Sequence, residues 1–205
     1  MNKKNLILTI SIIYCILGTY AQNNYYYWYK ENKVFLQLDK SKINIITNNS
    51  FSSVETSNIG IKSYTIEDDS NLPLNKFARA EFVNELNILE YYQKLNTIKN
   101  NTNVKGIGLY FKRTGAKSLG TSNYFYVKLK TVTDYSVLVQ LCDEKDVQIV
   151  KQVPYMPLWY ILSTTNCNFT SIELSNQFYE SGQFADTDPA FIFEYNNTCK
   201  VSLHC

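Results

Sequence analysis

The sequence has 205 residues, of which 45% are hydrophobic, 15% aromatic and 19% charged, and its formal net charge is +2. This composition is typical of a globular protein and not of a disordered chain. The near-neutral charge argues against a nucleic-acid partner. The single histidine, His204, cannot supply a His-based catalytic triad or a multi-histidine metal site. We therefore expect one or two small globular units without a metal, a cofactor or an enzymatic activity.

The N-terminus has the pattern of a secretory signal peptide. Two lysines precede an apolar stretch over residues 6–17, and small residues occupy the −3 and −1 positions before the bond after Ala21. A transmembrane anchor is the competing interpretation, but the stretch is shorter than the roughly 20 residues that span a bilayer. We predict cleavage after Ala21, a secreted or periplasmic location and no integral membrane segment afterwards. Cleavage removes two of the 20 basic residues and no acidic one, so the remaining chain is formally neutral.

The cysteines that follow the signal peptide are candidates for disulfide bonds, because an exported chain meets an oxidising compartment. They are Cys142, Cys167, Cys199 and Cys205. Their number allows three connectivities, among which the sequence does not choose. Two unpaired buried cysteines and a loosely bridged tail are the alternative. The absence of a CxxC spacing argues against zinc.

The first half of the chain mixes strand and helix patterns. Aromatic and apolar runs on either side of Glu31-Asn32 predict a hairpin, and apolar residues at helical spacing from Phe82 predict a helix. The expected elements are strands over 25–30, 33–38 and 42–47, a loop over 48–57, a helix over 82–95, a strand over 104–112 and a loop over 114–122. That last loop contains two glycines and is a candidate boundary between two units.

The second half shows a clearer order of elements. Strict alternation from Tyr124 places Phe125, Val127 and Leu129 on one face of a strand, and a capping box at Thr170 and Glu173 begins a helix. The expected elements are strands over 124–131, 147–153, 158–162 and 190–195, with helices after Asp134 and after Thr170. This βαββαβ order over residues 123–195 is the ferredoxin-like pattern.

We therefore expect an α+β protein in which a smaller region with a β-hairpin precedes the ferredoxin-like half. The expected parts are a signal peptide over 1–21, an N-terminal region over 22–113, the ferredoxin-like unit over 123–195 and a tail over 196–205. Both helices of such a unit cover one face of the sheet, and the run over 158–162 is apolar on both faces. The other face therefore needs a cover, either a partner or the first half of the chain.

Three stretches of the second half resemble the N-terminal prodomain of secreted subtilisin-like serine proteases, of the two-part fervidolysin-like type found in Bacteroidetes. They are 157–162 (PLWYIL), 173–185 (ELSNQFYESGQFA) and 188–191 (DPAF). The hairpin runs 25–30 (YYYWYK) and 34–38 (VFLQL) resemble the same family more weakly. Relatives usually have Glu before the proline, where this chain has Asp188.

The resemblance implies binding to a subtilisin-like protease in trans. Such a prodomain packs the open face of its sheet on the protease and lays its C-terminal tail along the substrate cleft. It thereby inhibits the enzyme or assists its folding. The candidate packing face is Tyr124, Tyr126, Trp159 and Ile161. The candidate cleft-binding tail is Glu194, Tyr195, Asn196, Asn197 and Thr198. Ordinary core packing for the face and a frayed terminus for the tail are the competing interpretations.

The chain departs from this family in carrying none of the catalytic Asp, His and Ser segments of a subtilase. This leaves two further interpretations. One is a truncated or orphan prodomain without a present partner. The other is an extracellular module that binds glycans or proteins through the aromatic hairpin, with Trp28 as its key residue.

Overall fold

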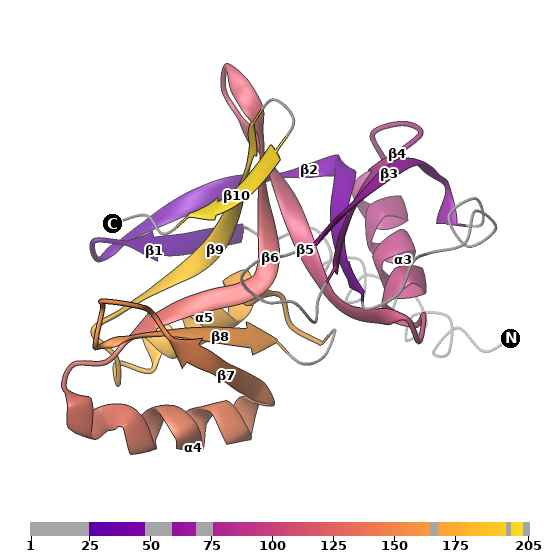
Figure 1. The fold of residues 1–205 in the computed structure, drawn as a ribbon. Helices are drawn as coiled ribbons and strands as arrows, with labels where there is room; N and C mark the ends of the chain where they lie inside the picture. The colour runs from indigo at the N-terminus through magenta and orange to yellow at the C-terminus, as the bar shows by residue number, and fades with distance from the viewer. Residues whose placement is uncertain (1–24, 48–58, 69–75, 165–167, 196–197, 203–205) are drawn as a thin grey trace, which may run out of the picture.

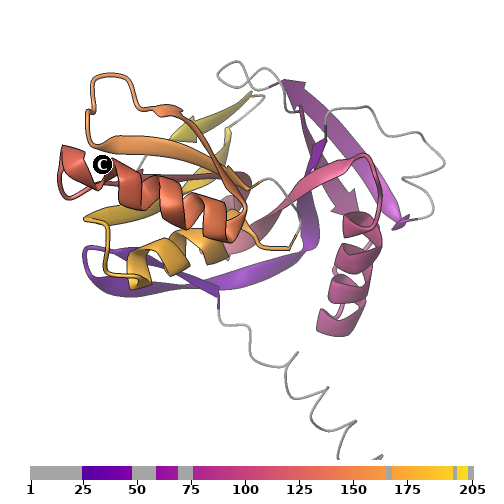
Figure 2. The same cartoon turned by 90° about the horizontal axis from the view of Figure 1, so that it is seen from below.

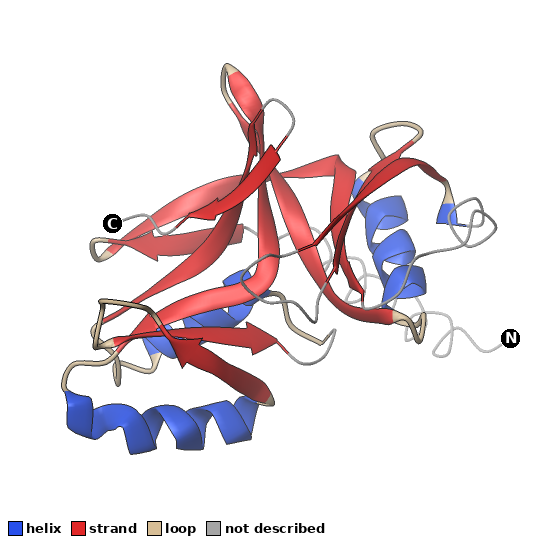
Figure 3. Ribbon diagram, viewed as in Figure 1, coloured by secondary structure: helices blue, strands red, loops and turns tan. Residues whose placement is uncertain are grey.

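The computed structural model describes residues 25–47, 59–68, 76–164, 168–195 and 198–202 (Figure 1). The expected signal peptide lies outside these ranges. The fold is mixed α/β, with a mostly antiparallel sheet and few helices (Figure 3). The strands are β1 (Tyr25–Tyr29), β2 (Asn32–Thr47), β3 (Ile61–Asp68), β4 (Lys76–Phe82), β5 (Val104–Arg113), β6 (Ala116–Lys128), β7 (Val147–Gln152), β8 (Trp159–Thr164), β9 (Asp186–Tyr195) and β10 (Thr198–Ser202). The helices are α3 (Ile88–Lys99), the short 3-10 turn Val132–Asp134, α4 (Tyr135–Lys145) and α5 (Ser171–Glu180).

The N-terminal hairpin is confirmed, with its turn one residue earlier than predicted. Lys30 and Glu31 adopt positive φ angles of 46° and 66° between β1 and β2. Positive φ at both central residues is the geometry of a type I′ turn, which suits the right-handed twist of the paired strands. The two strands predicted after this turn are one long strand, because β2 continues through an irregularity between Leu38 and Ile43.

The first helix begins later than predicted, because Phe82 ends strand β4 instead of starting a helix. The side chain of Asn87 accepts a hydrogen bond from the backbone N–H of Glu90, and the Glu90 carboxylate accepts one from the backbone N–H of Asn87. This capping box fixes the start of α3 at Ile88. Tyr91, Leu95 and Ile98 form the buried stripe of the helix. The helix predicted over residues 82–95 is therefore present from Ile88 onward, and its predicted start is wrong.

The loop predicted over residues 114–122 is wrong, because most of this segment belongs to β6. Its glycines and polar residues are typical of a loop, but Thr121 is buried and its hydroxyl accepts a 2.9 Å hydrogen bond from the backbone N–H of Leu109. Gly120 allows the Tyr110 ring to lie close, since a Cβ on Gly120 would stand 2.8 Å from that ring. Strand β6 therefore runs from the first region of the chain into the second.

The central path of the sheet has the order β10-β9-β6-β5-β2-β4-β3. Strand β6 bends along this path: its first part pairs with β5 and β9, and its last part, Tyr124 to Lys128, pairs with β8 and β9. Strand β7 pairs with β8, and β1 pairs with β2. One hydrogen-bonded sheet thus connects both halves of the sequence.

From β6 onward the elements follow the order strand, helix, strand, strand, helix, strand, and the strands lie side by side in the order β9-β6-β8-β7. Helices α4 and α5 lie together on one face of these strands (Figure 2). The alternation predicted for the strand from Tyr124 is confirmed. Phe125, Val127 and Leu129 are almost fully buried in one core with residues of α4 and α5.

Candidate functional site

The face of the sheet opposite α4 and α5 brings the predicted packing residues together. Tyr124, Tyr126, Trp159 and Ile161 belong to one apolar cluster that contains no residue of either helix. The register explains this arrangement, because Tyr126 is paired with Ile161, and side chains two residues apart point to the same face. We call these four residues the open face.

The first half of the chain covers one end of the open face. Ile46 of β2 and Phe77 of β4 belong to the same cluster, and the Phe77 ring packs edge-to-face on Tyr124 with 6.3 Å between ring centroids. Tyr124, Tyr126 and Ile161 are therefore buried, with 3%, 8% and 9% of their surfaces exposed. Trp159 is only half-buried. Intramolecular packing thus explains most of this face, and only its Trp159 end remains accessible.

A pocket of about 280 Å³ lies at this accessible end. Lys128 of β6 is paired with Trp159 on one side and with Asp186 on the other, so the three residues form one row across the sheet. The hairpin supplies a second wall. In Figure 1 the β1–β2 turn, the end of β6 and the start of β9 all lie on the left side of the molecule. The lining includes Tyr27, Tyr29, Lys128, Trp159, Asp186 and Asp188.

Two charged groups of this pocket, Lys128 and Asp186, form no ion pair with each other in the part of the chain that the structure describes. The Asp186 carboxylate accepts a 2.9 Å hydrogen bond from the backbone N–H of Thr187, but it forms no ion pair there. The Lys128 ammonium lies 5.8 Å from the centre of the Trp159 ring and forms no ion pair either. Burial raises the pKa of Asp186, and the Thr187 N–H and the Lys128 charge offset this only in part.

The aromatic hairpin is tied to helix α5 through Glu180. This carboxylate accepts hydrogen bonds from the Tyr26 hydroxyl at 2.7 Å and from the Trp28 indole N–H at 3.2 Å, and Lys33 lies 3.5 Å away. The Trp28 ring stacks on Tyr179 with 4.8 Å between ring centroids. One face of the Trp28 indole is therefore occupied within the chain.

Burial alone would raise the pKa of Glu180. The hydrogen bonds from Tyr26 and Trp28 and the nearby charge of Lys33 outweigh it, so this pKa lies below its ordinary value. The carboxylate is therefore held in its charged form by the hairpin. These contacts join the β1–β2 hairpin to helix α5, and we interpret the cluster as structural.

The predicted cleft-binding tail is in part paired with the sheet. Glu194 and Tyr195 lie at the end of β9, and Thr198 begins β10, which runs back antiparallel along β9. Asn196 and Asn197 lie outside the described residues. The backbone is extended as the tail interpretation requires, and β10 is the terminal strand of the central path.

Of the four cysteines predicted as disulfide candidates, the structure describes the side chain of Cys142. Cys142 is a free thiol on α4 with 2% of its surface exposed. Burial raises its pKa to about 12, so the thiol stays protonated at neutral pH. The side chains of Cys167, Cys199 and Cys205 are outside the described part, and a disulfide among them stays a prediction.

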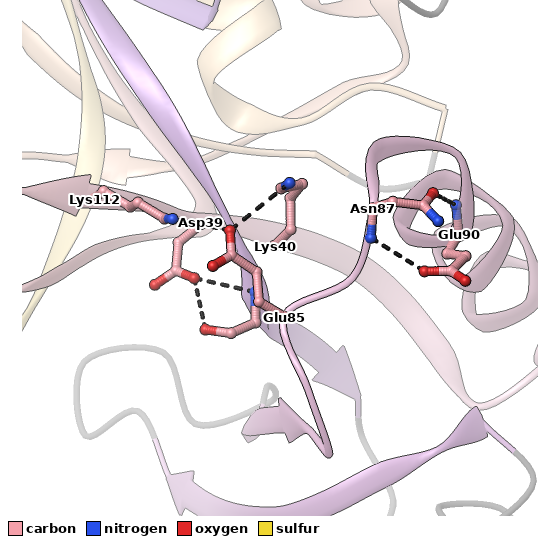
Figure 4. A network of polar contacts seen from close by, with 7 residues as sticks. Asp39, Lys40, Glu85, Asn87, Glu90 and Lys112 are labelled. Atoms are coloured by element: carbon pink, nitrogen blue, oxygen red, sulfur yellow. Dashed lines mark hydrogen bonds and ion pairs between the residues drawn. The ribbon is translucent and has the colours of Figure 1, made fainter.

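A second polar cluster lies where β2, β5 and the chain entering α3 meet (Figure 4). Glu85 accepts a 2.8 Å hydrogen bond from Lys112 and lies 3.7 Å from Lys40. The buried Asp39 carboxylate accepts hydrogen bonds from Ser41 and Ser118. Burial would raise the pKa of Asp39, but these hydrogen bonds outweigh it and lower that pKa. The partners are mutually satisfied, so this cluster is structural.

Strict alternation from Tyr124 places Lys128 on the same face as Tyr126, but the sequence does not show that Asp186 and Asp188 lie beside it. The strand was predicted to begin only at residue 190, whereas β9 begins at Asp186. The period-two spacing of Asp186, Asp188 and Ala190 is the signal that would have extended it.

Within the described residues there is no group of acidic, histidine or cysteine side chains suited to a metal, and no helix there is long and apolar enough to cross a membrane.

Comparisons with known proteins do not assign the chain to a family. No protein-family model matches the chain, and no curated protein matches it. Among solved structures, the small subunit of acetolactate synthase from Thermotoga maritima is similar over 76% of this chain and 98% of its own, with 11% identity and a TM-score of 0.28. A likeness this weak supports no functional argument.

Proposed function

We propose that this protein is a secreted, non-catalytic relative of subtilase prodomains that binds a subtilisin-like serine protease in trans. Binding would inhibit the protease or assist its folding. The observation that supports this best is the unit from β6 to β9. Its element order, its strand order β9-β6-β8-β7 and its two helices on one face fit a ferredoxin-like domain.

The contact would centre on the accessible end of the open face. Trp159 is half-buried there, and the other three residues of the face are buried by the chain itself. A partly exposed tryptophan beside a buried apolar cluster is a typical anchor of a protein interface. The protease would therefore contact Trp159 and its surroundings, while Tyr124, Tyr126 and Ile161 hold the sheet in shape beneath.

The edge strand β10 would supply the second contact. Its backbone is extended and its outer edge ends the central path of the sheet. An extended segment can pair with the edges of a substrate cleft by backbone hydrogen bonds. Filling the cleft in this way inhibits the enzyme. Binding to the native but not the unfolded protease stabilises the native state, which is the chaperone effect.

The test uses residues 22–205 and a panel of subtilisin-type proteases, each in its active form and in a form with a blocked catalytic serine. We expect at least one active protease to be inhibited and its blocked form to co-elute with the protein in size-exclusion chromatography. Trp159→Ala should weaken binding about tenfold or more, as expected for an anchor residue. The matched control is Tyr155→Ala, because Tyr155 is fully exposed in the β7–β8 turn. Absence of inhibition and of co-elution across the panel would refute the proposal.

A further inference from the structure

We propose that the pocket at the Trp159 end of the open face binds one ring of a neutral carbohydrate. The first observation concerns the aromatic side chains of the pocket. Tyr27, Tyr29 and Trp159 come from two different elements of the chain and line the same pocket. A sugar ring carries a patch of C–H groups that packs on an aromatic side chain, and the exposed surfaces of Tyr29 and Trp159 offer such platforms.

The second observation is that donors and acceptors converge on the pocket without satisfying one another. Asp186 and Lys128 are register partners on adjacent strands, yet within the described residues neither forms an ion pair. A hydroxyl group donates one hydrogen bond and accepts two. Neighbouring hydroxyls of a sugar can therefore accept from Lys128 and donate to Asp186 at the same time.

The balance of charge selects a neutral ligand. Lys30 and Lys128 stand against Asp186 and Asp188, so the pocket carries both signs in equal number. With equal numbers of both signs the pocket has no net charge to attract an anion or a cation, and a neutral polar ligand can bond to groups of both kinds. The volume of about 280 Å³ is just below that of ligand pockets, which are roughly 300–1,000 Å³, and suits one ring of a longer glycan.

This site differs from glycan binding on the hairpin itself. The Trp28 ring is stacked on Tyr179 and its N–H is bonded to Glu180. Trp28 also lines the pocket, but its ring is held on α5, so Tyr29 and Trp159 are the aromatic residues that would carry the sugar contact. The inference does not depend on protease binding and stands if no protease is found.

The test is isothermal titration calorimetry of residues 22–205 with neutral hexasaccharides of glucose, mannose, xylose and N-acetylglucosamine. We expect at least one of them to bind, and we expect Tyr29→Ala and Asp186→Asn each to weaken that binding about tenfold or more. The matched control is Phe35→Ala, which removes an exposed aromatic ring of the same hairpin that does not line the pocket. It should bind as the unmodified protein does.

Three results would overturn the inference. They are no binding of any of the four hexasaccharides, binding that survives both pocket variants, and binding of diglycine, a zwitterion, in place of the glycans. Circular dichroism of each variant shows whether it folds. If Asp186→Asn fails to fold, Tyr29→Ala carries the test, because the Tyr29 side chain is 43% exposed and lies at the edge of the hairpin.

Discussion

Glu180 is a charged link between the hairpin and helix α5. It accepts hydrogen bonds from Tyr26 and Trp28 and pairs with Lys33. These partners favour its charged form and lower its pKa despite partial burial. A carboxyl group whose pKa is depressed in the folded state stabilises the fold above its unfolded pKa of about 4.3, and this contribution is lost as the pH falls through the folded pKa.

Glu180→Gln should therefore lower stability at pH 7 and have little effect at strongly acidic pH. The urea midpoints of the variant and the unmodified protein, measured at pH 7 and near pH 3, check this. Glu144→Gln is the control, because Glu144 is exposed on α4 and accepts a hydrogen bond from Gln140 of its own helix. A difference between Glu180→Gln and the unmodified protein that persists unchanged near pH 3 would contradict the role of this charge.

A substitution of Phe125 tests the core between the sheet and helices α4 and α5. Its side chain is fully buried, and its ring packs edge-to-face on Phe178 of α5 at 5.2 Å between ring centroids. We expect Phe125→Ala to lower the free energy of unfolding by about 3–5 kcal/mol. Phe35→Ala removes the same atoms from a side chain that is 66% exposed, and it should change stability by less than about 0.5 kcal/mol. Equal losses in chemical denaturation would show that Phe125 is not in the core.

At the scale of elements, local signals decided how much the sequence could reveal. The capping box at Thr170 and the alternation from Tyr124 are short-range patterns, and both correctly located their elements. Strands β3 and β4 were not predicted, although they are neighbours in the sequence and pair with each other. Strand β6 was obscured by polar residues whose hydrogen-bonding partners only the fold provides. The open face was predictable from alternation. Its cover by Phe77 was not, because that contact joins residues far apart in the chain.

The capping box of α3 can be tested directly. Asn87→Ala removes the side chain that accepts the Glu90 N–H, and we expect a loss of about 1 kcal/mol in the free energy of unfolding. Asn96→Ala is the matched control, because Asn96 lies exposed within the same helix, where alanine favours helix formation. The control should be neutral or slightly stabilising. Chemical denaturation of both variants checks this, and an equal loss in both would argue against the cap.

At the scale of the whole molecule, strand β6 makes the two halves one structure. It pairs with β5 in the first half and with β8 and β9 in the second. Gly108 of β5 shows how tightly these strands fit, because a Cβ at this position would overlap the backbone carbonyl of Thr121 on β6. The two halves should therefore unfold together.

The protein has two tryptophans, one in each half, and they report on this coupling. Trp28→Phe leaves Trp159 of β8 as the reporter, and Trp159→Phe leaves Trp28 of β1. We expect the fluorescence of each variant in urea to show one transition that coincides with that variant's circular dichroism. Fluorescence and circular dichroism midpoints that separate would show that the halves unfold independently.

The central claim is that the open face binds a subtilisin-like protease at its Trp159 end, and one competition measurement tests it most directly. Inhibition of a responsive protease is titrated with the unmodified residues 22–205, with Trp159→Ala and with Tyr155→Ala. We predict that the inhibition constant rises about tenfold or more for Trp159→Ala and stays unchanged for Tyr155→Ala. The claim is contradicted if no protease of the panel is inhibited, or if Trp159→Ala inhibits as well as the unmodified protein.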